Sequence, residues 1–242
     1  MRVAVISDIH GNLHALEAVL QAVDEQRVDV TWCLGDLVGY GPRPNRCCAL
    51  TAERAAICLA GNHDLAVRGD IDLEEFAGDA AAAAAWTRGV LDDDSRSYLA
   101  GLEPSARAEG VELYHGSPRD PVWEYVLSDE AAAAALELTR APIVLVGHSH
   151  VALVIRAEGD SLSGGLAPDG SELELGDDRW LLNPGSVGQP RDGDPRAAWL
   201  LLDLDARSAR FHRVPYPIER TRAEIRERGL PELLGARLER GE

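Results

Sequence analysis

Five short polar clusters in this 242-residue sequence contain side chains that could bind a metal ion. Each cluster follows an apolar run, and five of the seven histidines lie inside the clusters, whereas His14 and His212 lie outside. The clusters are Ser7-Asp8-Ile9-His10, Gly35-Asp36, Gly61-Asn62-His63-Asp64, His115-Gly116 and Gly147-His148-Ser149-His150. Turns often contain serine, asparagine and aspartate, but they do not call for histidine, so we interpret the histidines as ligands.

The donor types indicate which chemistry the clusters could support. Carboxylate oxygens and imidazole nitrogens without cysteine suit divalent ions such as Mn, Fe, Co, Ni or Zn. Two such ions, roughly 3.5–4 Å apart, need a bridging carboxylate and can share a hydroxide that attacks phosphorus. Asp36 is the candidate bridge. The clusters therefore predict a hydrolytic centre that contains two metal ions.

The apolar runs before the clusters are the elements that must position them. Continuous aliphatic and β-branched runs of this length are typical of strands buried on both faces. Ligands in layered α/β folds bind outside the carboxyl ends of the strands, so residues that are distant in sequence can meet there. The expected strands are Arg2–Ile6, Val28–Leu34, Ala56–Leu59, Val111–Tyr114 and Ile143–Val146.

The order and spacing of the five clusters resemble the calcineurin-like metallophosphoesterases. The resemblance runs from Met1 through His150 and extends to a loop that is similar to one in small prokaryotic members, Asn183-Pro184-Gly185-Ser186-Val187-Gly188. A single Gly-Asp pair would carry little weight, but five clusters in family order, each after a predicted strand, form a specific signal.

This resemblance implies a ligand set for each metal ion. The first ion would be held by Asp8, His10, Asp36 and His150, and the second by Asp36, Asn62, His115 and His148. Both sites would keep coordination positions open, as catalytic metals require. His63 would bind no metal and would be the catalytic residue, donating to a phosphoryl oxygen or protonating the leaving group. Asn62 and His63 are also the candidate substrate-binding residues.

Two departures from the family pattern bear on the substrate. The stretch from Gly35 to Gly41 lacks the aspartate and arginine of family members that act on phosphoproteins, and Ala60 stands where those members have a second arginine. Without these bidentate clamps we expect a phosphodiesterase on small or nucleotide-like substrates. Phosphomonoesters and dinucleoside polyphosphates are alternatives. Which residue orients His63 stays open, because the reach of the adjacent Asp64 cannot be read from sequence.

A protein of another class could have the same fold. The small subunit of retromer is similar in fold but works as an interaction scaffold, with its catalytic histidine position filled otherwise. The presence of His63 and of a full ligand set favours an enzyme over such a catalytically silent scaffold. Arg43, Arg46, Arg119 and Arg191 lie near the clusters and could contact phosphate, although single arginines more often form surface ion pairs.

Composition restricts the partners. The formal charge is −17 and every basic side chain except histidine is an arginine, so we do not expect a long nucleic acid as a partner. We expect a small phosphorylated substrate instead. No apolar stretch reaches 18 residues and no leader pattern precedes the first strand, which predicts no membrane partner and a cytoplasmic protein. The four cysteines lack Cys-x-x-Cys spacing, which favours reduced thiols.

The connecting segments complete the expected architecture. We expect helices over the segment from Asn12 to Asp24, in a segment opened by Pro44 and in a segment after Ser128. Residues 70–102 should form two helices that are divided near Gly89 and overhang the site. Short runs after His150 suggest a second, mainly antiparallel sheet, and residues 218–238 a charged helical tail that could also support a homo-oligomer. We expect one domain over residues 1–242, a four-layer α/β/β/α sandwich of two packed mixed sheets.

Overall fold

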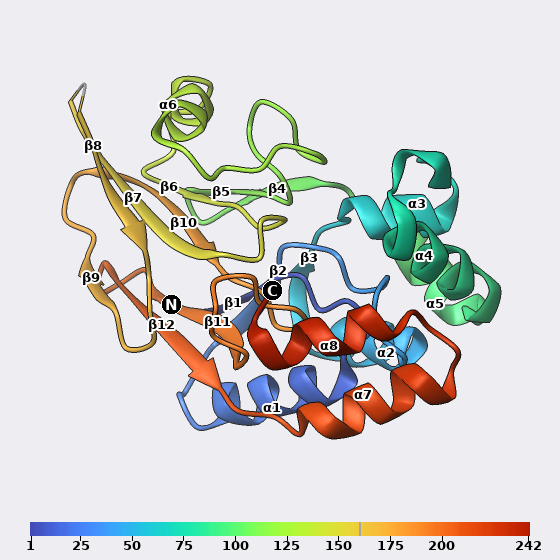
Figure 1. The fold of residues 1–242 in the computed structure, drawn as a ribbon. Coiled ribbons are helices and arrows are strands. Elements are labelled where there is room, and N and C mark those ends of the chain that lie inside the picture. The colour runs from blue at the N-terminus through green and yellow to red at the C-terminus, as the bar shows by residue number, and fades with distance from the viewer. Residues whose placement is uncertain (160) are drawn as a thin grey trace.

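The computed structural model describes residues 1–159 and 161–242, in which twelve strands form two six-stranded sheets surrounded by eight α-helices (Figure 1). Sheet A has the order β3-β2-β1-β11-β12-β9, with the strands Ala55–Cys58, Val30–Cys33, Arg2–Ile6, Ala197–Asp203, Ser208–Val214 and Glu172–Glu174. Sheet B has the order β4-β5-β6-β10-β7-β8, with the strands Ser105–Ala108, Val111–Tyr114, Ile143–Leu145, Arg179–Pro184, Ala152–Glu158 and Ser161–Leu166.

Both sheets combine a parallel part with antiparallel strands. In sheet A, β1, β2 and β3 are parallel and β11 pairs antiparallel with β1. In sheet B, β5, β6 and β10 are parallel, while β4, β7 and β8 are antiparallel to their neighbours. The polar clusters follow β1, β2, β3, β5 and β6. Because parallel strands end at a common edge, the clusters of each sheet are brought to one side of the molecule.

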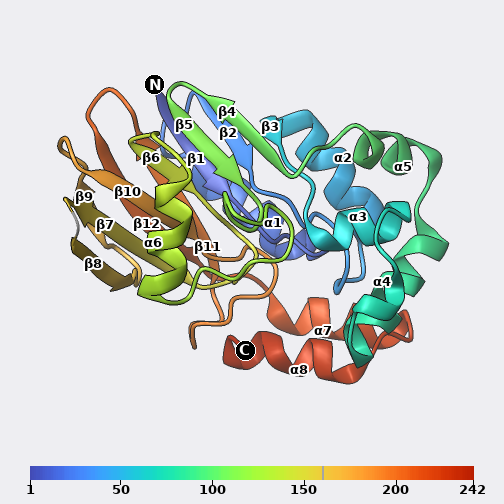
Figure 2. The same ribbon diagram turned by 90° about the horizontal axis from the view of Figure 1, so that it is seen from above.

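Three hydrophobic cores separate the layers. Alternate residues of β1 face opposite ways: Val3 and Val5 pack into a core between the sheets, whereas Ala4 and Ile6 pack into a core shared with α1. A third core joins the outer face of sheet B to α6. Figure 1 shows these layers one above the other, from α6 at the top to α1 at the bottom, and in the view from above α6 lies in front of the strands and α1 behind them (Figure 2). The predicted four-layer α/β/β/α sandwich is thus confirmed.

Of the eight helices, α1 and α2 pack on sheet A and α6 packs on sheet B, while the other five pack mainly on neighbouring helices. Their bounds are Leu13–Asp24 (α1), Pro44–Arg54 (α2), Asn62–Arg68 (α3), Gly78–Val90 (α4), Asp93–Ala100 (α5), Asp129–Glu137 (α6), Ile218–Glu227 (α7) and Glu232–Arg240 (α8), with a 3-10 turn at Leu73–Glu75. The predicted caps are present, since Asn12 accepts from Ala15 N at 3.3 Å and Ser128 accepts from Ala131 N at 3.2 Å.

Two local expectations were wrong. The strands after His150 were expected to form a sheet of their own, but β11 and β12 join sheet A and β7 and β10 join sheet B, because β11 pairs with β1 and β10 pairs with β6. By contrast, the helix break expected near Gly89 falls just after it, at Leu91 and Asp92, and Asp92 caps α5 by accepting from Ser95 N at 2.8 Å. The C-terminal segment forms two helices whose buried Ile225, Leu234 and Leu238 pack together, so it is not merely a solvated tail.

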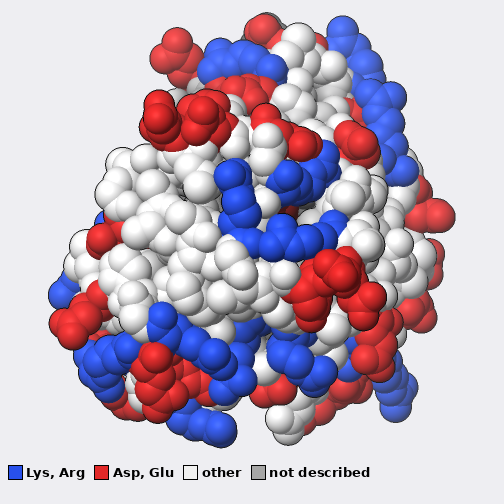
Figure 3. All heavy atoms as spheres, turned by 90° about the vertical axis from the view of Figure 1, so that its right-hand side faces the viewer, with Lys and Arg blue, Asp and Glu red and all other residues white. Residues whose placement is uncertain are grey.

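The surface carries both signs of charge despite the acidic composition. On the face that bears α3, α4 and α5, basic side chains gather around a central hollow among acidic patches (Figure 3). The four cysteines are unpaired. Among the described residues, no helix combines the length and apolar character needed to cross a membrane.

Candidate metal centre

The turns after the parallel strands bring the predicted ligands into two adjoining groups. The first group consists of Asp8, His10, Asp36 and His150, and the second contains Asp36, His115 and His148; within each group the ligand atoms lie within 4.8 Å of one another. Asn62 joins the second group, because its Oδ1 lies 3.2 Å from His115 Nε2. Asp36 is the member that the two groups share, and all of these side chains are buried.

The imidazoles are held so that bare nitrogens face one another. His10 Nδ1, His115 Nδ1 and His150 Nδ1 lie 3.1, 2.9 and 2.7 Å from the backbone carbonyls of Val38, Leu34 and Gln189. A carbonyl only accepts, so each Nδ1 carries a proton, which leaves Nε2 as the nitrogen that can bind a metal ion. His10 Nε2 and His150 Nε2 are nevertheless only 3.0 Å apart. Two facing lone pairs repel unless a cation lies beside them, so this arrangement fits metal ligands.

The carboxylates point to the same conclusion. Asp8 Oδ1 and Asp36 Oδ2 are buried and have no hydrogen-bond partner in the described structure. Asp36 Oδ2 lies 3.5 Å from His10 Nε2 and 3.6 Å from His115 Nε2, while its Oδ1 accepts from His63 N at 2.9 Å. An orphaned buried carboxylate oxygen is costly, and coordination to a cation would remove that cost.

Backbone conformation at the ligand positions is unusual. Five of the predicted ligand residues adopt left-handed φ angles between 50° and 62°: Asp8, His10, Asp36, His148 and His150. Among residues other than glycine, this conformation is uncommon and clusters at functional sites. The sharp turns it produces let short loops aim two ligands each, as in Asp8 with His10 and His148 with His150.

Close packing of the loops leaves no room for a larger residue at Gly61. A Cβ on Gly61 would lie 2.0 Å from Asp36 Oδ1 and 2.6 Å from Asp36 N. The Asn183–Gly188 loop is equally tight, because a Cβ on Gly188 would lie 1.9 Å from Ile9 O. Gly188 N donates to Asp8 O and Val187 N donates to Ser7 O, each at 2.9 Å. These contacts fix the loop that carries Asp8 and explain the glycines in both motifs.

Burial controls the protonation of the cluster. Desolvation raises the pKa of Asp8 to about 7 and raises that of Asp36 well above its ordinary value, with the neighbouring Asp64 adding to the shift at Asp36. Desolvation also lowers the pKa of His10 and of His150 well below the usual range. The electrostatic effect of His63 lowers the pKa of His10 further, and that of Arg191 lowers the pKa of His150 further. The protein alone therefore disfavours charge here, and a divalent ion would reverse that preference.

His63 is positioned by aromatic packing and not by a carboxylate. Its ring lies 4.5 Å from the Tyr40 ring and 4.8 Å from the Phe76 ring, and its Nδ1 has no partner within the described part of the chain. Asp64 is occupied elsewhere, because its carboxylate accepts from Leu37 N and Gly61 N at 3.0 Å and from Val38 N at 3.2 Å. Burial lowers the pKa of His63 to about 3, so its imidazole is neutral at pH 7.

Of the remaining polar residues singled out in the sequence, most lie outside the pocket at the cluster, whereas Arg191 lines it. Arg43 and Arg119 form ion pairs with Glu224 and Glu124, and Arg46 lines a separate hollow. His14 approaches Glu224, and His212 stacks on Trp199. Arg191 alone among the four arginines lines the pocket at the cluster. Asn183 holds the nearby loop by donating to Gly147 O at 2.8 Å and to Ser149 Oγ at 3.0 Å.

A cavity of about 180 Å³ opens onto the cluster and includes residues that the sequence did not single out. It is lined by His63, His148, His150, Tyr40 and Arg191, together with Phe76 from the segment before α4 and Trp123 and Tyr125 from the loop between β5 and α6. Single aromatic residues in loops carry no recognisable sequence signal, which is why these three were missed.

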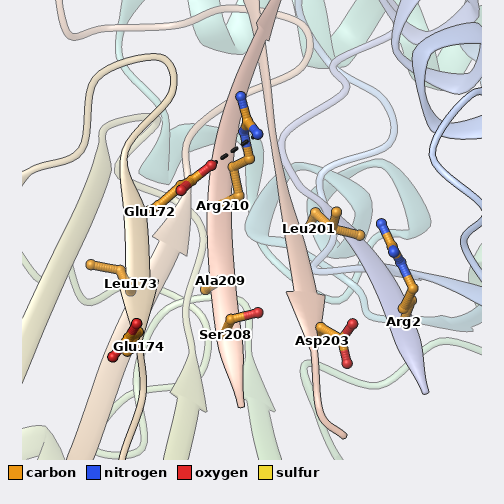
Figure 4. Close-up of a pocket in the computed structure, with 9 residues that line it drawn as sticks. All are labelled: Arg2, Glu172, Leu173, Glu174, Leu201, Asp203, Ser208, Ala209 and Arg210. Carbon is orange, nitrogen blue, oxygen red and sulfur yellow. Dashed lines mark ion pairs between the residues drawn. The ribbon is translucent and has the colours of Figure 1, made fainter. Parts of the chain in front are cut away.

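A larger cavity, of about 640 Å³, lies on sheet A away from the cluster (Figure 4). Its side chains come from β1, β9, β11 and β12, and the close-up shows Arg210 directed at Glu172, with 2.9 Å between Arg210 Nη1 and Glu172 Oε1. It contains no histidine or cysteine. Arg210 is thus paired with a carboxylate of the neighbouring strand, and size alone does not make this cavity a site of chemistry.

Comparisons with known proteins were made for the whole chain. A family model described as the calcineurin-like phosphoesterase superfamily domain matches residues 1–207. An uncharacterised protein of Methanocaldococcus jannaschii is 36% identical over 241 residues, which are 98% of this chain and 96% of that protein. The crystal structure of a metallophosphoesterase from Sphaerobacter thermophilus is 44% identical, with a TM-score of 0.91 over 100% of this chain and 99% of that chain. A hypothetical protein from Pyrococcus horikoshii OT3 is 21% identical, with a TM-score of 0.81 over 100% and 98%, and shares the fold.

Proposed function

Because this chain belongs to the calcineurin-like phosphoesterase superfamily and is a phosphoester hydrolase, we propose that it hydrolyses small or nucleotide-like phosphodiesters with two divalent metal ions. The observation that carries the proposal is the shared Asp36 between two buried donor groups in which imidazole nitrogens lie 3.0–3.2 Å from one another. The family resemblance found in the sequence is confirmed, whereas the number of ions and the substrate are the proposed parts.

The proposed ligands follow the two groups. Asp8, His10, Asp36 and His150 would hold one ion, and Asp36, Asn62, His115 and His148 the other. The nitrogen and oxygen donors fit Mn, Fe, Co, Ni or Zn. When bound, the ions supply Lewis-acid activation of a water molecule and neutralise charge on the phosphate.

His63 is the proposed catalytic residue. It lines the pocket but lies outside both ligand groups. Since its low pKa leaves the ring neutral, we propose that it donates an N–H to a phosphoryl oxygen or to the departing oxygen, a contact that strengthens as negative charge develops there. The packing of Tyr40 and Phe76 against its ring supports a fixed orientation.

The choice of a diester rests on the limited positive charge around the pocket. Arg191 is the only arginine or lysine among the residues that line it. A phosphomonoester carries an additional negative charge at neutral pH, for which the missing family arginines would be the natural partners. Monoesters and dinucleoside polyphosphates are the alternative substrates.

We also propose a single domain over residues 1–242, whose segment 70–102 covers the pocket. A cytoplasmic location is proposed as well, which the unpaired cysteines support.

Hydrolysis of bis(p-nitrophenyl) phosphate and of p-nitrophenyl phosphate in the presence of Mn, Ni, Co, Zn or Mg tests the proposal. We expect metal-stimulated turnover with a higher kcat/KM for the diester. The Asp36→Asn variant should lose metal and activity, and the His63→Ala variant should keep metal and lose rate, while His14→Ala serves as a histidine control outside the pocket. Absence of metal-stimulated turnover with both esters would favour the scaffold, and a preference for the monoester would replace the proposed substrate class.

A further inference from the structure

The pocket over the metal centre has an aromatic wall beside His63. The Phe76 ring lies 4.8 Å from the His63 ring and 5.3 Å from the Trp123 ring. The Phe76 and Trp123 rings are neighbours whose planes are tilted by 53°, so they form one angled wall with no gap between them for a third ring. Tyr125 is engaged differently, because its ring stacks on His148 at 4.1 Å with an interplanar angle of 14°. The free wall is therefore made by Phe76 and Trp123.

The loop that carries Trp123 is fixed by its own hydrogen bonds. Asp120 Oδ1 accepts from Val122 N and Trp123 N, both at 3.1 Å. Gly116 N donates to Pro121 O at 2.8 Å, which closes the loop directly after the ligand His115. The Trp123 backbone is thus anchored without help from a metal or substrate, as expected for a preorganised binding surface.

Arg191 supplies a cation that lacks an acidic partner. Its Nη2 lies 2.9 Å from Gln189 Oε1 and 3.3 Å from the Tyr40 hydroxyl, its buried Nε has no partner, and it forms no ion pair within residues 1–159 and 161–242. Its backbone N donates to His150 O at 3.1 Å, which couples it to the ligand loop. In a chain of net charge −17, a guanidinium left without a carboxylate at a pocket mouth fits an anionic ligand.

We propose that this pocket selects phosphoesters whose leaving alcohol carries a planar aromatic ring, such as a nucleoside or a phenol, with the ring against the wall of Phe76 and Trp123 and a phosphoryl oxygen on Arg191. This inference rests on the proposed phosphodiesterase function and names its substrate class. The wall adjoins His63, so a planar leaving group lying on it would place its departing oxygen beside the residue proposed to donate to it. Stacking of a base on an aromatic side chain changes affinity by roughly 5–150-fold.

Binding of three phosphonates, whose P–C bonds cannot be hydrolysed as esters, separates the two parts of the proposal. Methylphosphonate, cyclohexylmethylphosphonate and benzylphosphonate are titrated calorimetrically into the Mn-loaded protein. They share the anion, and the last two match in size but differ in planarity. We expect benzylphosphonate to bind at least about fivefold tighter than its cyclohexyl counterpart.

Variants assign each part to its residues. Phe76→Leu and Trp123→Leu should each reduce the benzyl preference. Trp123→Leu, whose ring is not packed on His63, should also leave methylphosphonate binding unchanged. Arg191→Met should weaken all three ligands by a common factor of about tenfold or more and keep the preference. Trp86→Leu and Arg46→Met, which alter a separate hollow, are the matched controls and should change neither quantity. Metal content and thermal unfolding show that each variant is folded and loaded.

The outcomes distinguish this inference from the function on which it rests. Equal binding of the benzyl and cyclohexyl ligands to the wild type, or a preference that survives both leucine variants, would overturn the aromatic wall. Unchanged methylphosphonate binding in Arg191→Met would overturn the anion contact. If none of the phosphonates binds while bis(p-nitrophenyl) phosphate is still hydrolysed with metal, the inference fails and the phosphoesterase stands. Loss of metal-stimulated turnover in the wild type would instead remove the proposed function.

Discussion

The Asp36→Asn substitution should separate metal binding from folding. Asp36 is buried, and its Oδ1 accepts from His63 N while its Oδ2 has no partner in the described chain. Asparagine keeps an oxygen for His63 N but replaces the negative Oδ2 with a neutral amide. Because a buried, unpaired carboxylate destabilises the metal-free fold, we expect the metal-free variant to be at least as stable as the metal-free wild type.

Metal should reverse that order. An ion at 100 times its Kd stabilises the folded state by about 2.7 kcal/mol, so two independent sites give about 5 kcal/mol. In a domain of this size each kcal/mol raises Tm by roughly 2–4 °C, which predicts a rise of roughly 10–20 °C for the wild type in Mn²⁺. The variant loses the ligand that both groups share, so its Tm should rise by only a small part of that amount.

Thermal unfolding followed by circular dichroism, in EDTA and then in excess Mn²⁺, measures both effects. The exposed Asp94 provides the matched control, because Asp94→Asn makes the same chemical change away from the cluster and should keep the full metal-induced rise. An Asp36→Asn protein that gains as much Tm from Mn²⁺ as the wild type would refute the assignment of Asp36 as the shared ligand. A metal-free variant that is markedly less stable than the wild type would refute the argument from its unpaired carboxylate oxygen.

Three further predictions concern neighbouring residues. His63→Ala should retain the wild-type metal content in elemental analysis while kcat falls by about 10²–10⁴-fold, and equal loss of metal would contradict a purely catalytic role. Asp64→Ala leaves three buried backbone N–H groups unpaired, which costs about 1–3 kcal/mol each. Urea denaturation should therefore show a large loss of stability with or without metal. An unchanged free energy of unfolding would argue against this role of Asp64. The pKa of Asp8, about 7, lies above the ordinary value, so below pH 7 a proton occupies the carboxyl group that a metal ion needs. Calorimetry should therefore show that the affinity for Mn²⁺ falls about tenfold or more for each pH unit below 7. An affinity that does not change with pH would contradict this prediction.

The sequence predicted the composition of the cluster because its logic is local. A buried parallel strand can be recognised from a short aliphatic run in the sequence. The residue after this run lies at the edge of the sheet, whichever strand is its neighbour. Asp8, Asp36 and His115 could thus be placed together before their strands were assigned to sheets. The assignment itself failed for β11, because its pairing with β1 joins segments almost 200 residues apart and nothing in either strand specifies that partner.

The rest of the site depends on tertiary contacts without a sequence pattern. The sequence could not tell that Asp64 turns away from His63 to the backbone of the neighbouring loop, because both directions are open to an aspartate at that position. The wall of Phe76 and Trp123 likewise arises from two loops that meet only in the folded chain. Family order indicated the metal chemistry, whereas the substrate-facing residues required the structure.

Anomalous X-ray diffraction from crystals of the Mn-loaded protein tests the central claim most directly. The account predicts two anomalous peaks, with Asp36 between them, one beside His10 and His150 and the other beside His115 and His148. A single peak, or manganese bound away from these histidines, would contradict a two-metal centre built on Asp36.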